Sequence, residues 1–249
     1  MLVTNGIVVH RYEEKPGPHR LGRHQELDSR SLKHLVEAAR RPIKPAEWPS
    51  PIPILDQGNV GSCTAEAGTA HVAALYGLGY QTITLDGISL AANPQQFAVH
   101  LYHAETLIDG IPGVYPPDDT GSSGLAVCKV LKRAGLIAAY HWATSLLGAA
   151  SMLQRGGCLI GMPWYNAFFH PDANGFIDAS ASWAQSGVAG GHELYVEALE
   201  SWDELDPQKV VVRLRNSWGA TWGDHGCGRM RGLTYQRLRQ QIDVKQGQR

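Results

Sequence analysis

The strongest constraint on the fold is a change in residue pattern partway along this 249-residue chain. Small and apolar residues cover most faces of Cys63–Tyr76, which predicts a buried helix, and a second helix is expected over Ser123–Ala134. After a shorter helical piece around Leu146–Gln154, the chain has apolar, β-rich runs separated by Gly, Pro, Asp and Asn. We therefore expect a helical first part and a mainly β second part.

The segment before the first predicted helix has the character of an arm. Residues 1–50 are polar and rich in His, Arg and Pro, with one helical pattern over Arg30–Arg40. The proline-rich segment Pro42–Pro53 favours extended backbone and marks a boundary. We expect three parts: an N-terminal arm (1–50) that could be a pro-segment or a docking element, a main domain (51–235) and a C-terminal tail (236–249).

Composition argues against several classes of function. A formal net charge of −1 provides no basic field to attract phosphates, so nucleic acid is not an expected partner. No apolar run reaches the roughly 18 residues of a membrane span, and the N-terminus lacks the pattern of a Sec signal peptide. Four cysteines are too few for a disulfide framework in a chain of this length. We expect a cytoplasmic or virion-associated protein that is not inserted in a membrane.

A glycine-containing loop, Asp56–Ser62, leads directly into the first predicted helix and carries candidate catalytic residues. The positive end of a helix stabilises a thiolate and lowers the thiol pKa, so Cys63 at this end is a candidate nucleophile. Gln57 precedes it closely enough to aim its side-chain amide at an oxyanion. The backbone N–H of Cys63 would be the second donor.

Two later blocks supply the groups that a nucleophilic cysteine requires. His192 follows a pair of glycines and leads into a predicted strand, and Asn216 begins the block Asn-Ser-Trp-Gly. A cysteine nucleophile needs a base that takes its proton, and that base needs an acceptor that fixes its tautomer. The order Cys, His, Asn meets both needs.

The three blocks QGNVGSC, GGH and NSWGATWG resemble the signature blocks of papain-family cysteine peptidases. The resemblance extends from about Pro51 to Gly232. It implies an α+β, papain-like two-lobe fold, with a helical left lobe (51–145), a β-barrel-like right lobe (146–235) and the active-site cleft between them. It also implies hydrolysis of peptide bonds through a thioester on Cys63, protein or peptide substrates, and no cofactor.

The resemblance also points to residues that contact the substrate. The loop Asp119–Gly124 is similar to a loop whose backbone pairs with the P2 residue of the substrate. Gly121, Ser122 and Ser123 are therefore candidate contacts, and Gly191 beside the histidine is another.

Two tryptophans follow the asparagine. By the same analogy, Trp218 would shield the hydrogen bond between His192 and Asn216 from water, and Trp222 would border the primed side of the cleft. Both tryptophans could equally be aromatic residues of the core.

Three positions depart from the family pattern. Val60 and Thr64 replace the cysteine and the aromatic residue that commonly flank the nucleophile, so a disulfide common in secreted members cannot form there. This favours a bacterial or phage-type member. Glu193 follows His192 where the family usually has a small residue, which places a carboxylate near the base unless its side chain points away.

The arm leaves two interpretations open. It lacks the long helical pattern of the family's best-known inhibitory propeptides, so zymogen control of that type is not expected. Inhibition by a shorter segment that blocks the active site is the alternative left open. The rival interpretation is a papain-fold structural or interaction component of a larger assembly, such as a phage particle, which docks through the arm and has residual or secondary peptidase activity.

Histidine spacing does not predict a metal site. His100 and His103 share one face of an expected helix, but no third ligand stands at zinc spacing. Val196 occupies the position at which a zinc-binding helix beginning at His192 would need its second histidine.

Overall fold

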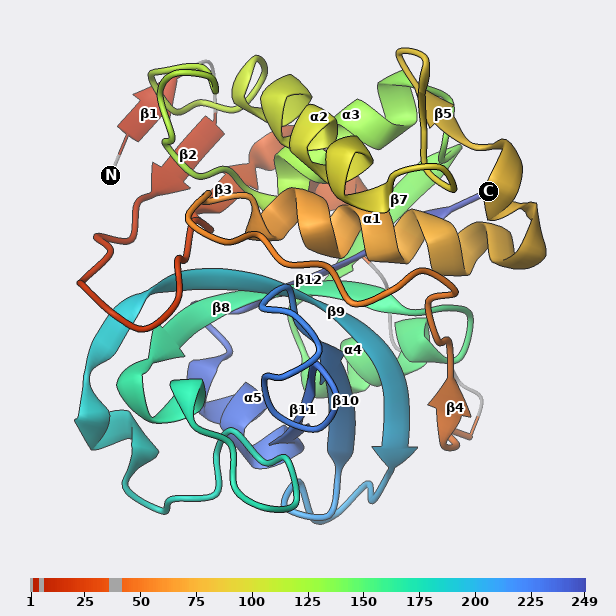
Figure 1. Ribbon diagram of the computed structural model, residues 1–249. Helices are drawn as coiled ribbons and strands as arrows, with labels where there is room; N and C mark the ends of the chain where they lie inside the picture. The colour runs from red at the N-terminus through yellow and green to blue at the C-terminus, as the bar shows by residue number, and fades with distance from the viewer. Residues whose placement is uncertain (1, 5–6, 36–41) are drawn as a thin grey trace.

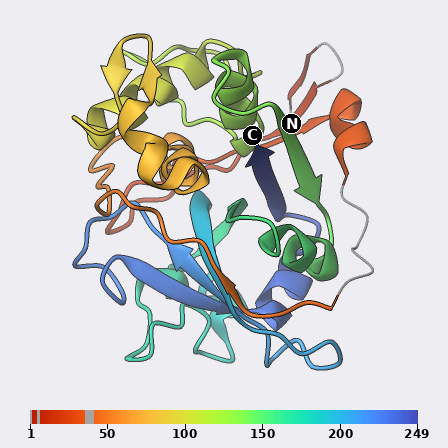
Figure 2. The same cartoon turned by 90° about the vertical axis from the view of Figure 1, so that its right-hand side faces the viewer.

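The computed structural model describes residues 2–4, 7–35 and 42–249 (Figure 1). A group of helices packs on one side of the molecule and a curved antiparallel sheet lies on the other (Figures 1 and 2). Each side has its own cluster of buried apolar side chains. The chain is therefore an α+β protein with a helical lobe and a sheet lobe, as predicted.

Three helices form the helical lobe: α1 (Cys63–Tyr76), α2 (Pro94–Thr106) and α3 (Gly124–Arg133). The bounds predicted for α1 are confirmed, and its first eleven residues are all buried because small side chains let the neighbouring elements approach closely. Asn93 and Ser123 each accept a hydrogen bond from a backbone N–H in the first turn of α2 and α3, which explains where these helices begin. The lobe also contains η2 (Gly77–Thr82), β5 (Thr84–Leu85) and β6 (Ile88–Ser89).

The sheet lobe is built on antiparallel strands in the order β11-β10-β9-β8-β12-β7. The short strand β4 pairs with residues near the C-terminal end of β9. The strands are β4 (Ala46–Glu47), β7 (Ala139–Ala143), β8 (Cys158–Tyr165), β9 (Val188–Ser201), β10 (Val211–Arg215), β11 (Cys227–Arg231) and β12 (Asp243–Gln248). The helices and short 3-10 turns of this lobe are α4 (Leu146–Leu153), α5 (Gly232–Leu238), η3 (Asn166–Phe169) and η4 (Trp183–Ser186).

The central strand β9 contacts the helical lobe through α1. Its residues 189–199 are all buried, although they include a histidine and two glutamates, His192, Glu193 and Glu197. Such side chains are rarely buried unless they have partners or a function, so this strand directs attention to the interface between the lobes.

The end of the chain differs from the expected tail. Residues 243–248 form β12, which lies between β8 and β7 inside the sheet. Its polar side chains hid this role in the sequence, because Lys245 and Gln246 are each only 2% exposed. Nε2 of Gln246 donates hydrogen bonds to the carbonyl oxygens of Met152 and Gly156, at 2.9 and 2.7 Å, which compensates for its burial.

The arm forms a small antiparallel sheet of β1 (Leu2–Thr4), β2 (Ile7–His10) and β3 (Gln25–Asp28), followed by the 3-10 helix η1 (Ser29–His34). The helix expected over Arg30–Arg40 is thus a 3-10 helix as far as residue 34, and residues 36–41 lie outside the described chain. Between β2 and β3 the chain descends past α1 to the level of the sheet (Figure 1). In the described ranges, no helix is both long and apolar enough to cross a membrane.

Candidate active site

Cys63 is the first residue of α1 and is 0% exposed. The loop before it is folded locally: the Asp56 side chain accepts a hydrogen bond from the N–H of Gly58, and the N–H of Val60 bonds to the Gln57 carbonyl. The backbone N–H of Glu193 lies close enough to the thiol to lower its pKa, and α1 contacts β9. The beginning of α1 therefore meets β9 at the residue that follows His192.

His192 and Asn216 are joined by a hydrogen bond of 2.7 Å between Nε2 and Oδ1. His192 lies on β9, and Asn216 follows the end of β10, the adjacent strand. Oδ1 can only accept, so this contact assigns the proton to Nε2 and leaves Nδ1 with a free lone pair. Among the described residues, Nδ1 has no hydrogen-bond partner.

Trp218 covers the imidazole of His192. The two rings stack at 4.5 Å between centroids and at an angle of 20°. Trp222 packs edge-on against Trp218 at 5.3 Å, and its indole N–H bonds to the Phe169 carbonyl. Both tryptophans belong to the core cluster of the sheet lobe, so Trp222 is a core aromatic and Trp218 is in addition a cover for the His192 ring.

Gln57 is buried beside the residue that follows Asn216. Its Oε1 accepts a hydrogen bond from the Ser217 hydroxyl at 2.7 Å, and its Nε2 donates one to the Val60 carbonyl at 2.8 Å. An amide nitrogen has two hydrogens, so one donor of Gln57 remains for a further acceptor. Short contacts thus connect three of the four predicted catalytic residues, Gln57, His192 and Asn216, by way of Ser217.

Burial keeps the cysteine and the histidine neutral in this structure. Burial raises the pKa of the Cys63 thiol, and this effect outweighs the hydrogen bond from the N–H of Glu193. Burial also lowers the pKa of His192 to about 3, although the bond to Asn216 acts in the opposite direction. The lowered thiol pKa expected from the helix end is therefore not found while the site is covered.

The arm provides this cover. The backbone N–H of Ser122 donates to the Gly22 carbonyl at 2.8 Å, and the N–H of His24 donates to the Ser122 carbonyl at 2.7 Å. On the opposite side, the N–H groups of Gly22 and Arg23 donate to the Gly191 carbonyl at 3.2 and 3.0 Å. The arm thus lies between two of the predicted substrate contacts, Ser122 and Gly191.

The arm fits closely against the loop before Cys63. A Cβ atom added to Gly22 would lie 2.1 Å from the carbonyl oxygen of Gly61, so only glycine permits this approach. The preceding residue, Leu21, is 1% exposed in the core cluster of the sheet lobe, and His19 stacks on Trp218 at 4.4 Å. The arm is therefore packed into the site by apolar and aromatic contacts as well as hydrogen bonds.

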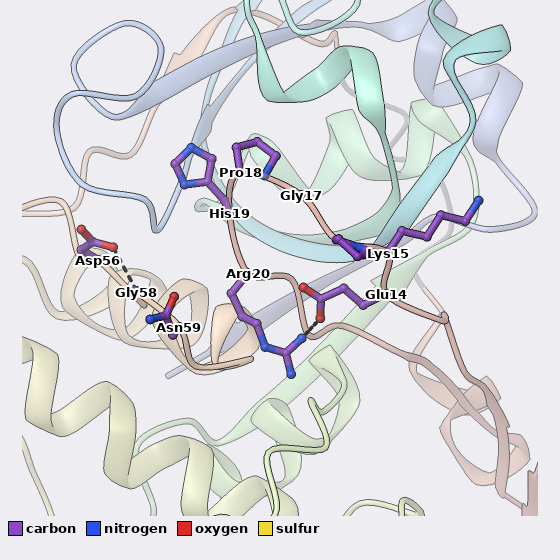
Figure 3. Close-up of a pocket in the computed structure, with 10 residues that line it drawn as sticks. Glu14, Lys15, Gly17, Pro18, His19, Arg20, Asp56, Gly58 and Asn59 are labelled. Atoms are coloured by element: carbon purple, nitrogen blue, oxygen red, sulfur yellow. Dashed lines mark hydrogen bonds and ion pairs between the residues drawn. The ribbon is translucent and has the colours of Figure 1, made fainter.

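A cavity of about 500 Å³ remains beside the arm, where residues 14–20 face Asp56, Gly58 and Asn59 (Figure 3). In this view the arm side chains Glu14, Lys15 and Arg20 come from one curved segment, and the three loop residues come from the segment that leads to α1. Open space thus adjoins the loop that carries Gln57, even with the arm in place.

The other two predicted substrate contacts lie on the same loop as Ser122. The backbone N–H of Gly121 bonds to the Tyr102 hydroxyl at 2.8 Å. The Ser123 hydroxyl caps α3 and donates to Glu26 of the arm at 2.6 Å. Ser123 is therefore occupied by structural contacts, whereas the backbone of Ser122 is the part of this loop that holds an extended chain.

No protein-family sequence model matches this chain, and no curated protein matches it in sequence. Its structure is similar to xylellain, a cysteine protease from Xylella fastidiosa, with a TM-score of 0.67 over 95% of this chain and 99% of xylellain at 17% identity. The chain has the papain-like fold.

Precursor forms of other papain-like enzymes are also similar to this structure. Procathepsin B S9 from Trypanosoma congolense matches with a TM-score of 0.58 at 11% identity, covering 92% of this chain and 86% of its own. Procathepsin L 3 from the larval midgut of Tenebrio molitor also has a TM-score of 0.58, at 13% identity, covering 88% and 75%. The papain-like fold therefore includes nearly the whole chain.

The papain-like fold also contains site residues that sequence reasoning missed. Arg23 and Asp243 are both buried beside Glu193, although they come from the expected arm and the expected tail. The position of Glu193 directly after the histidine was the one available signal, because a carboxylate at a usually small position requires a partner.

Proposed function

We propose that this protein is a cysteine peptidase that hydrolyses peptide bonds. His192 takes the thiol proton of Cys63, and the sulfur attacks the carbonyl carbon of the peptide bond. The second amide hydrogen of Gln57 and the backbone N–H of Cys63 stabilise the oxyanion. His192 then gives the proton to the departing amine, which leaves a thioester on Cys63, and water hydrolyses that thioester with His192 as base.

The hydrogen bond between His192 and Asn216 is the observation that carries this proposal. It fixes the imidazole with an unprotonated Nδ1, the form that a base requires, on the strand β9 that packs against α1, the helix that begins at Cys63. The papain-like fold supports the same interpretation.

The arm must leave this site before a substrate can bind. It occupies the backbone groups of Ser122 and Gly191, and its Leu21 side chain fills part of the core next to the site. We infer that the full chain with its arm closed is an inactive form. Burial of the neutral cysteine and histidine agrees with this inference.

A full-length protein whose arm cannot close provides the test. Gly22→Ala introduces a Cβ atom that would overlap the Gly61 backbone, so the arm should be displaced. We expect this variant to cleave a mixture of peptides, and we expect the double variant Gly22→Ala, Cys63→Ala to lose at least about 1000-fold in rate. Equal cleavage by both proteins, or no cleavage by either, would contradict the proposal.

A further inference from the structure

The Arg23 side chain of the arm lies in a fully buried pocket beside the proposed active site. Its Nη2 donates a hydrogen bond to Oδ2 of Asp243 at 2.8 Å, and its Nη1 donates one to the Gln241 carbonyl at 3.3 Å. Its Nε lies 3.7 Å from Oε2 of Glu193. The pocket thus presents oxygen atoms to every nitrogen of the guanidinium.

Three adjacent strands place these acidic groups in a row. In the sheet register, Glu193 of β9 lies opposite Gly161 of β8, and Gly161 lies opposite Asp243 of β12. A Cβ atom on Gly161 would lie 2.4 Å from Oε2 of Glu193, 2.5 Å from Nε of Arg23 and 2.7 Å from Oδ1 of Asp243. The missing side chain in the middle of the row therefore makes room for the guanidinium.

The pocket requires a cation from outside its own walls. Lys245 is buried with its Nζ 2.8 Å from Oδ1 of Asp243, so the walls contain one ammonium group and two carboxyl groups. Within the described chain, both oxygens of Glu193 lack a hydrogen-bond partner. A buried carboxylate without a partner is costly, so a second positive charge stabilises this pocket.

Glu193 and His192 have separate surroundings. Successive side chains of a strand point to opposite faces, so the Glu193 carboxylate is directed to Arg23 while the His192 ring is directed to Asn216 and Trp218. The carboxylate after the histidine therefore belongs to the pocket and not to the base. The Glu193 side chain thus points away from the imidazole of His192, the alternative that the sequence left open.

The backbone on both sides of Arg23 is held by groups that any extended peptide could use. Arg23 lies opposite Ser122, between the two hydrogen bonds that Ser122 makes with the arm. Its own N–H donates to the Gly191 carbonyl. None of these contacts depends on a side chain of the arm, so a bound substrate with the same extended backbone would direct one side chain into the pocket.

We propose that this pocket is a subsite for a guanidinium group, and that the substrates are peptides with arginine at the residue that lies opposite Ser122. This inference rests on the proposed peptidase function and deepens it. A planar guanidinium can serve Asp243, the Gln241 carbonyl and Glu193 at once, which the single ammonium group of lysine cannot do. An aliphatic side chain would leave the Glu193 carboxyl group without a charged partner, whereas Asp243 would keep Lys245.

The cleavage test uses the full chain with Gly22→Ala, which displaces the arm, combined with Arg23→Ala, so that no arm arginine competes for the pocket. Gly22→Ala combined with Arg20→Ala is the matched control. Arg20 is also an arm arginine, but its ion pairs with Glu14 and Asp119 lie outside the pocket. Peptides that differ only at the selected residue carry arginine, leucine, or citrulline, which has the shape of arginine without its charge. For the Gly22→Ala, Arg23→Ala protein we expect kcat/KM to be at least about 100-fold higher for arginine than for citrulline. If the kcat/KM values for the arginine and citrulline peptides differ by no more than about twofold, the guanidinium subsite is wrong.

A binding measurement separates this subsite from the peptidase function. Methylguanidinium should raise the melting temperature of Arg23→Ala and leave that of Arg20→Ala unchanged, and neutral methylurea should affect neither. If methylguanidinium acts in this way but no peptide is cleaved, the peptidase proposal fails and the guanidinium subsite stands. If peptides are cleaved without preference and methylguanidinium has no selective effect, the subsite is wrong and the peptidase proposal stands.

A variant of the pocket wall adds an independent check. On the Gly22→Ala, Arg23→Ala background, Asp243→Asn should lower the ratio of arginine to citrulline cleavage by about tenfold or more. Asp178→Asn is its matched control, because Asp178 is also buried in the sheet lobe but pairs with Arg231. An unchanged ratio for Asp243→Asn would contradict the role of this carboxylate.

Discussion

Oδ1 of Asn216 lies 2.7 Å from Nε2 of His192. The same oxygen accepts the backbone N–H of Ser217 at 2.8 Å, which holds the amide in one orientation. The imidazole is therefore fixed by a side chain that is itself fixed by its backbone. In our account this pair sets the direction of proton transfer, and Trp218 protects it from water.

Replacing Asn216 with alanine should lower kcat/KM for a peptide by about 10- to 100-fold, measured in the arm-displaced background. The imidazole would lose its orientation and its preferred tautomer, but it would still be present to take the thiol proton. Steady-state rates across a range of pH values provide the measurement.

His192→Ala is the comparison for this prediction. It removes the base and the acid together, so its loss should exceed that of Asn216→Ala by about tenfold or more. Equal losses in the two variants would contradict an orienting role for Asn216.

Gly22→Ala should expose the nucleophile. The added Cβ would lie 2.1 Å from a backbone oxygen that cannot move aside easily, so the closed position of the arm becomes unfavourable. We expect iodoacetamide to alkylate Cys63 at least about tenfold faster in this variant than in the unchanged protein. Mass spectrometry of the Cys63 peptide provides the rate.

Gly17→Ala is the matched control for the close approach of Gly22. It adds the same methyl group to the arm, but the nearest atom, in the ring of Phe169, lies 3.3 Å from the added Cβ. Its alkylation rate should stay close to that of the unchanged protein. Equal acceleration in both variants would show that the arm is not held by the contact between Gly22 and Gly61.

Acid should weaken the closed arm through His24. Its Nδ1 accepts the N–H of Tyr12 at 3.0 Å, so the ring is neutral and its Nε2–H donates to the Thr120 carbonyl. Burial lowers its pKa from 6.5 to about 4. Between pH 6.5 and about pH 4, His24 of a released arm binds a proton that His24 of the closed arm does not. The closed arm is therefore most stable above pH 6.5, and this stability is lost as the pH falls through about 4.

Hydrogen exchange of residues 20–24 measures this weakening. Protection, corrected for the intrinsic rate, should be lower at about pH 4.5 than at about pH 7.5. His24→Gln keeps an acceptor and a donor without a titration in this range, so its protection should change less. Equal pH dependence in the two proteins would assign the effect to other groups, such as His192.

The bounds of α1 and the strands β8, β9 and β10 were predictable, because small or apolar residues in these segments follow a regular pattern. The approach of His192 to Asn216 also follows from the sequence, through the resemblance of the blocks that contain them. The residue pattern and the motifs were therefore sufficient to predict an element whose residues are all buried in the same part of the core.

The arm and β12 were not predictable in this way. Arg23 and Asp243 are 220 residues apart, and each is a polar residue in a polar segment until the other is placed beside it. Lys245 likewise looks like a surface residue, and its burial depends on Asp243. Ion pairs between distant segments leave no periodic signal, so burial of these residues becomes visible only in the folded chain.

Trapping the thioester on Cys63 tests the proposed nucleophilic attack at its first covalent step. The arm-displaced protein is mixed with the nitrophenyl ester of a blocked dipeptide that carries arginine at the selected residue, quenched in acid within the first turnover, and digested for mass spectrometry. We predict an acyl group on the peptide that contains Cys63, removable by hydroxylamine and absent from the Cys63→Ala protein. Turnover of the ester with no acyl group on Cys63, or with the acyl group on another residue, would contradict nucleophilic attack by Cys63.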